Sequence, residues 1–196
     1  MRIPNPDMAE HLLKEASRLN PGKWVLHNRV AGDCAFAIAS RCPGLNPEAA
    51  RILGLLHDIG RRFGTADLRH VYLGHRFMME LGFADSARIC LSHSFPVKDL
   101  RAYIGNNDCT DDETTFMRLE IEKMAFNEYD TLIQLCDAIS LPEGPCTVEK
   151  RLVDVVLRHG FNDLTVEKWK AFLELKKHFE NRMQCGLYEP FDNLIL

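Results

Sequence analysis

The sequence is poor in the features that mark several unusual protein classes. It has only 12 Gly and 9 Pro among 196 residues, which excludes a collagen-like or low-complexity chain. No run of about 18 apolar residues occurs, and the first residues lack the apolar segment of a secretory leader. The formal net charge is −4, which argues against nucleic-acid binding by bulk electrostatics. We therefore expect a cytoplasmic protein with no membrane or nucleic-acid partner.

The cysteines also lack the spacing of a disulfide framework or a metal site. There are seven of them, an odd number, and no two are spaced as CxxC. Most lie inside apolar runs, as Cys34, Cys90 and Cys136 do. This pattern is typical of reduced thiols that pack in a core, and it argues against both disulfides and a cysteine metal site.

What the sequence does contain is a series of helical patterns separated by Pro and Gly. No convincing run of alternating apolar and polar residues predicts a strand. The whole chain, residues 1–196, is therefore predicted to be a single-domain, all-α, multi-helix bundle, with the helices of 146–196 packed on the rest. The expected helices are residues 6–19, 23–40, 47–59, 68–81, 84–93, 115–126, 130–141, 148–159 and 166–185, with loops at 60–67 and 105–113.

Polar residues stand at unexpected places in this pattern. His57 and Asp58 are adjacent at the end of the most apolar predicted helix, ARILGLLHDIG. A buried carboxylate costs several kcal/mol unless it is paired or binds a metal. Ala50 and Gly54 share the face of Asp58 at four-residue spacing, and such small residues leave room for a neighbouring helix or an ion.

Three further polar residues lie on buried or half-buried faces of predicted helices: His27, His93 and Asp137. Each taken alone is more often a hydrogen-bonded core residue or a solvated one. Together they supply imidazole and carboxylate groups, which suit zinc, manganese or iron better than magnesium alone. Their number and order therefore favour a metal site.

The block LGLLHDIG, with His27 upstream in HNRVAGDCAFAIA and Asp137 downstream in LIQLCDAIS, resembles the HD superfamily of metal-dependent phosphohydrolases. Two further segments, RHVYLGHRFMMELGF and ARICLSHS, resemble those that carry additional ligands in the dinuclear subset of this family. They place these ligands at His70 and His93. The resemblance spans residues 25–140.

The resemblance implies an HD-type fold, a metal centre and a reaction. His27, His57, Asp58 and Asp137 would bind one divalent ion, and Asp58 would bridge to a second ion held by His70 and His93. Fe, Mn, Zn or Ni would fit, with Mg as a further option. A metal-activated hydroxide would then hydrolyse a phosphate ester or anhydride of a nucleotide or another small phosphorylated metabolite.

Basic residues near these motifs are the predicted phosphate binders. Arg61 follows HDIG directly, where many relatives carry a Lys directed at the substrate phosphate, and we assign it to binding and catalysis. Arg62, Arg29 and Lys98 are weaker substrate-binding candidates.

The remaining histidines are assigned less directly. His70 and His75 lie five residues apart and face different directions by about 140°, so only one of them is expected to coordinate. The resemblance favours His70, and His75 would line the pocket instead. His11, His159 and His178 fall outside the match and are interpreted as surface or packing residues.

Two other functions stay open. A minority of HD proteins hold two irons with the same six ligands, so a di-iron oxygenase acting on a small diol is the alternative enzyme. A non-catalytic binding module is disfavoured because no ligand is missing. The mixed-charge last helix, EKWKAFLELKKHFENR, is interpreted as a solvated face that could also support a homodimer.

Overall fold

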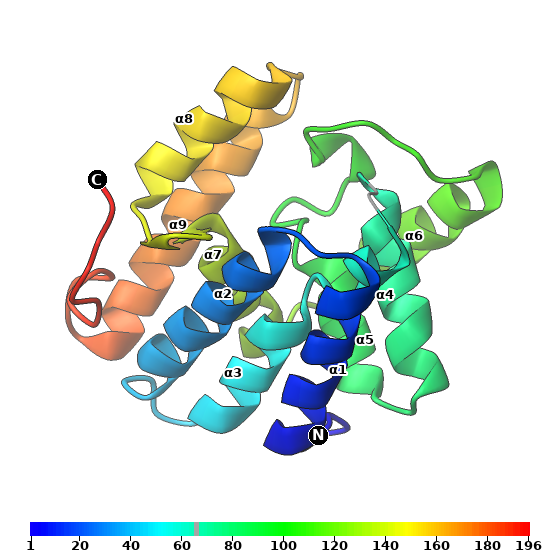
Figure 1. Ribbon diagram of the computed structural model, residues 1–196. Helices are drawn as coiled ribbons and strands as arrows, with labels where there is room; N and C mark the ends of the chain where they lie inside the picture. The colour runs from blue at the N-terminus through cyan, green and yellow to red at the C-terminus, as the bar shows by residue number, and fades with distance from the viewer. Residues whose placement is uncertain (65–66) are drawn as a thin grey trace.

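The computed structural model describes residues 1–64 and 67–196, and their regular structure is almost entirely helical (Figure 1). This confirms the all-α prediction, and the helices pack into one compact unit. The elements are α1 (Pro6–Leu19), α2 (Trp24–Ala39), α3 (Pro47–Leu56), η1 (Ile59–Phe63), α4 (Arg69–Glu80), α5 (Ala84–Ser92), η2 (Leu100–Ala102), α6 (Asp111–Lys123), α7 (Glu128–Ala138), β1 (Ser140–Leu141), β2 (Gly144–Pro145), α8 (Val148–His159) and α9 (Thr165–Met183).

Several helix starts are set by capping side chains. In α1 the Asn5 side chain accepts a hydrogen bond from the amide of Met8. Helix α6 begins with a capping box between Thr110 and Glu113, which lengthens it into the acidic stretch that was predicted to be a loop. Helix α7 likewise begins at Glu128 rather than at residue 130, because Asn127 caps it.

Helix α3 ends earlier than predicted, and this matters for the site. It stops at Leu56, so His57 and Asp58 lie beyond its last full turn rather than inside a helix. A 3₁₀ turn, η1, follows directly, where the sequence predicted a loop. Both polar side chains therefore leave the backbone at a helix end, where adjacent residues can point to one centre.

Two smaller corrections concern the C-terminal part. Residues 140–145 form a short antiparallel hairpin, β1–β2, although no strand was predicted. Helix α9 includes Thr165 as its first residue instead of using it as a cap, and it ends at Met183 because Gln184 takes a left-handed conformation with φ 56°.

The core is formed by the apolar faces of α2, α3 and α7, which α9 covers through Phe172 and Phe179. All the cysteines are free, and Cys34, Cys90 and Cys136 are fully enclosed. Their predicted role as packing residues of a reduced protein agrees with this. No helix in residues 1–64 and 67–196 has both the length and the hydropathy needed to cross a membrane.

Helices α2 and α3 cross unusually closely (Figure 1). A Cβ atom on Gly54 would lie 2.8 Å from the Ala31 carbonyl oxygen and from the Gly32 Cα. The small residues of the Asp58 face therefore make room for a helix, not for an ion. This close approach brings His27 of α2 next to His57 at the end of α3.

Candidate metal centre

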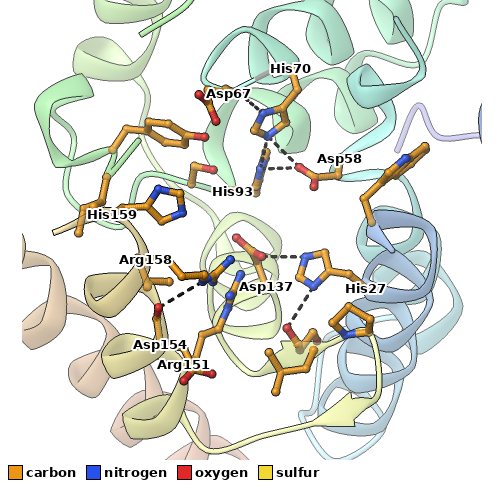
Figure 2. A pocket seen from close by; sticks show the side chains of 18 of the residues that line it. His27, Asp58, Asp67, His70, His93, Asp137, Arg151, Asp154, Arg158 and His159 are labelled. Carbon is orange, nitrogen blue, oxygen red and sulfur yellow. Dashed lines mark hydrogen bonds and ion pairs between the residues drawn. The ribbon is translucent and has the colours of Figure 1, made fainter. Parts of the chain in front are cut away.

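Six predicted ligands from five segments converge, and five of them line one pocket (Figure 2), while His57 is buried behind it. They combine four imidazoles and two carboxylates. They are His27 on α2, His57 and Asp58 after α3, His70 on α4, His93 just after α5 and Asp137 on α7.

One half of the cluster lies around His27. Its Nε2 atom is 3.0 Å from Asp137 Oδ1 and 3.2 Å from His57 Nε2. His57 Nε2 in turn lies 3.8 Å from Asp137 Oδ1. At these distances the three ligand atoms are close enough to share one ion, and His57, His93 and Asp137 form a further potential metal-binding group.

The other half lies around Asp58. Its Oδ1 atom is 2.8 Å from His70 Nε2 and 3.3 Å from His93 Nε2. The same oxygen is 4.0 Å from His57 Nε2, so Asp58 belongs to both halves. Asp58, His70 and His93 form one potential metal-binding group, and His27, His57 and Asp58 form another.

The hydrogen bonds of the imidazoles fix which nitrogen faces the centre. The Nδ1 atom of each ring lies against a backbone carbonyl: Ser140 for His27 at 3.1 Å, Gly54 for His57 at 2.7 Å, Asp67 for His70, and Cys90 for His93 at 2.9 Å. A carbonyl only accepts, so Nδ1 carries the hydrogen and the Nε2 of a neutral ring presents a lone pair. Four lone pairs and two carboxylates then face one another, an arrangement that repels itself without a cation. The donor set therefore fits bound metal ions.

Burial and charge act on the protonation of these groups. Burial lowers the pKa of His57 to about 4 and also lowers that of His70, so both rings are neutral near pH 7. Burial alone would raise the pKa of Asp58, but Arg61 and His70 outweigh it and hold this pKa well below its usual value. Burial opposes charge on His93 as well, yet its hydrogen bond to Asp58 raises its pKa.

The buried cluster could hold metal ions, and the compact helical fold around it is compatible with an HD-type protein. Comparisons with protein-family models, with curated proteins and with solved structures find no match. What the chain does is therefore inferred from the chemistry of its own site.

Arg61 lies at the cluster but makes a different contact from the predicted one. Its Nε donates to Asp58 Oδ2 at 2.5 Å, and its backbone carbonyl accepts from the Asn20 side chain at 2.6 Å. Arg61 also lines the pocket. Arg61 therefore contacts the Asp58 carboxylate, and its predicted role at a substrate phosphate stays a prediction.

The other predicted phosphate binders lie outside the described lining of this pocket. Their positive groups instead contact carboxylates or an aromatic ring elsewhere in the molecule. The pairs are Arg29 with Glu10 at 2.9 Å, Arg62 with Glu15 at 2.8 Å, and Lys98 above the Phe126 ring at 4.9 Å.

His75 does not line the pocket, contrary to the alternative role predicted for it. Its Nδ1 lies 3.1 Å from the Ala87 carbonyl oxygen, and its ring packs against Phe116. Burial lowers its pKa. The turn of the helix between His70 and His75 therefore separates a cluster residue from a packing residue.

The pocket above the cluster has a volume of about 660 Å³, and its far side is basic. Four basic residues, Arg151, Arg158 and His159 of α8 and Lys168 of α9, line this side beside one carboxylate, that of Asp154 (Figure 2). Sequence reasoning missed all four, and it interpreted His159 as a surface or packing residue. The available signal was the seven-residue spacing of Arg151 and Arg158, which puts both on one face of a helix.

Proposed function

We propose that this protein is an HD-type, metal-dependent phosphohydrolase. It would cleave a phosphate ester or anhydride of a nucleotide or another small phosphorylated metabolite. The observation that carries the proposal is the convergence of four imidazole lone pairs and two carboxylates at the base of a pocket with a basic far side. Polar groups of this kind are costly to bury together unless they serve a cation.

Two divalent ions would be held by two ligand sets that share Asp58. His27, His57 and Asp137 would complete one set, and His70 and His93 the other. Mixed imidazole and carboxylate ligands suit Fe, Mn, Zn or Ni, with Mg as a further option. When bound, such ions lower the pKa of water and polarise phosphoryl oxygens.

The protein's own residues hold the ligand side chains in position. The backbone carbonyls of Ser140 and Gly54 hold the rings of His27 and His57 in one orientation. Arg61 fixes the Asp58 carboxylate from the side opposite the histidines. Hydrolysis forms a bond between a water oxygen and phosphorus and breaks the bond to the leaving oxygen, which receives a water proton.

The alternative of a di-iron oxygenase uses the same six ligands, so the ligands alone do not separate the two activities. The basic far side of the pocket does bear on the choice. Arg151, Arg158 and Lys168 favour an anionic substrate over a neutral diol. We therefore place the phosphohydrolase first.

The test joins elemental analysis of the purified protein to a phosphate-release screen over nucleotides, sugar phosphates and para-nitrophenyl phosphate with added Mn²⁺. We expect about two metal ions per chain and phosphate release that stops when a chelator removes them. A protein that holds iron, releases no phosphate from any compound and consumes dioxygen with a diol would overturn the proposal. A protein that binds no metal would overturn both activities.

A further inference from the structure

Several cations line one side of the pocket, although none of them belongs to the metal cluster. We call Arg151, Arg158 and Lys168 the cationic wall; they come from α8 and α9 and line the pocket together with the cluster. Figure 2 shows Arg151 and Arg158 reaching from α8 toward Asp137. The wall therefore faces the part of the cluster that contains Asp137.

Arg151 is close enough to both other cations to disfavour their charge. Burial lowers the pKa of Arg158 and the charge of Arg151 lowers it further, while Asp154 opposes the shift. Burial lowers the pKa of Lys168 to about 8; Asp137 opposes this shift and Arg151 adds to it. Gathering like charges in a partly desolvated pocket is unfavourable unless an anion joins them.

No carboxylate of residues 1–64 and 67–196 forms an ion pair with any member of the cationic wall. The Arg158 Nε donates to the Asp154 backbone carbonyl at 3.2 Å, and the Lys168 Nζ donates to the Ala102 carbonyl at 3.1 Å. Other basic residues of α9 behave differently. Lys176 pairs with Glu149 at 3.1 Å, and Arg182 pairs with Glu128 at 2.5 Å. The wall is thus a place where cations contact backbone carbonyls and an aromatic ring but form no ion pair with a carboxylate of the described residues.

The size of the pocket allows a ligand that touches both sides. Its volume of about 660 Å³ is within the range of sites for nucleotide-sized ligands and exceeds the needs of one phosphate group. Two guanidinium groups and an ammonium group match the geometry and charge of a phosphate. Trp24, Leu141 and Pro142 also line the pocket and offer apolar surface to the organic part of a ligand.

We infer that the substrate carries two separate phosphate groups, one placed at the metal cluster and cleaved there, the other bound by Arg151, Arg158 and Lys168. This inference rests on the proposed phosphohydrolase activity and narrows its substrate class. The second phosphate stays on the organic product. Simple monophosphates would then be weaker substrates, because they leave the wall without an anion.

Binding of phosphonates to the metal-loaded, full-length protein tests this inference without any turnover, because a phosphoesterase does not cleave a carbon–phosphorus bond. Isothermal titration calorimetry compares alkyl monophosphonates with α,ω-bisphosphonates of the same chain, over a series of chain lengths. We expect the best bisphosphonate to bind at least about tenfold more tightly than its matched monophosphonate. Equal affinity at every chain length would overturn the inference.

Substitutions show whether the wall causes the preference. Arg151→Gln and Lys168→Met should each remove most of the bisphosphonate advantage and leave monophosphonate binding unchanged. Arg158→Gln is the third wall variant, with the same expected result. Its side chain is exposed, so this variant should fold normally. Lys170→Met is the matched control, because it removes an exposed lysine of the same helix that does not line the pocket.

The outcomes separate this inference from the proposed function. An advantage that persists in all three wall variants would come from chelation of the metal ions and would overturn the role of the wall. A carboxyalkyl phosphonate that binds as tightly as the bisphosphonate would overturn the assignment of the second group as phosphate. A bisphosphonate preference in a protein that hydrolyses no phosphate ester would reject the proposed function but keep the two-anion pocket.

Discussion

The two sides of the pocket are built in opposite ways. At the metal cluster, His57 and His93 are each 1% exposed, and backbone carbonyls fix the rings from behind. At the cationic wall, Arg158 is exposed, Arg151 and Lys168 are half-buried, and no carboxylate pairs with them within the described residues. A change in the first region should therefore remove the metals themselves, whereas a change in the second should alter what binds and leave the metals in place.

The largest effect should come from Asp58→Ala. Asp58 touches ligands of both halves of the cluster, so its loss should remove both metal ions and lower phosphatase activity by at least about a thousandfold. Metal content by elemental analysis and phosphate release measure the two effects. Asp33→Ala, at an exposed carboxylate paired with Arg51, is the control and should keep both. If Asp58→Ala kept its full metal content, the claim that changes at the cluster remove the metals, unlike changes at the wall, would be wrong.

A narrower effect is expected at α4. His70→Ala should remove about half of the bound metal, because His70 belongs to only one of the two ligand sets. His75→Ala should keep all of it, since its ring is bound to the Ala87 carbonyl and packs on Phe116. The opposite result, with metal lost only from the His75 variant, would show that the ligand of this helix has been misassigned.

Arg61→Gln should give an intermediate effect. It removes the group that holds Asp58 Oδ2, and loss of such a supporting contact lowers metal affinity or activity about 10–100-fold. Arg62→Gln, whose guanidinium pairs with Glu15, is the neighbouring control and should change little. If Arg61→Gln instead kept its metal affinity and bound substrate more weakly, Arg61 would contact the substrate phosphate as the family resemblance implies.

The smallest effect is a pH dependence at the wall. Burial lowers the pKa of Lys168 to about 8. The charge of Asp137 opposes this shift, and the charge of Arg151 adds to it. The ammonium form dominates below this pKa and is lost above it. The bisphosphonate advantage should therefore fall a few-fold as the pH rises from about 7 to about 9. Titration calorimetry across this range should show the fall in the unsubstituted protein and a flatter profile in Lys168→Met.

The sequence determined the helical class and the members of the cluster. The period of apolar residues and the Pro and Gly breaks predicted most helices, because these signals are local. His57 and Asp58 were noticeable because a polar pair in an apolar helix carries a cost that has to be offset. Helix boundaries near Asp111 and Glu128 were missed, since capping side chains extend helices into stretches that look like acidic loops.

Only the tertiary structure decided how these residues meet. The close crossing at Gly32 and Gly54 and the early end of α3 bring His57 toward both His27 and Asp58, and neither follows from periodicity. The cationic wall was also missed: the spacing of Arg151 and Arg158 puts them on one helix face, but such residues look like those of an ordinary solvated face, and nothing in the sequence adds Lys168 to them. They become a site only because α8 and α9 pack beside α7 and turn those faces toward the metal cluster. A polar residue in an apolar helix can be recognised from the sequence of that helix, because its burial is costly. A pocket cannot, because it depends on contacts between segments that are distant in the chain.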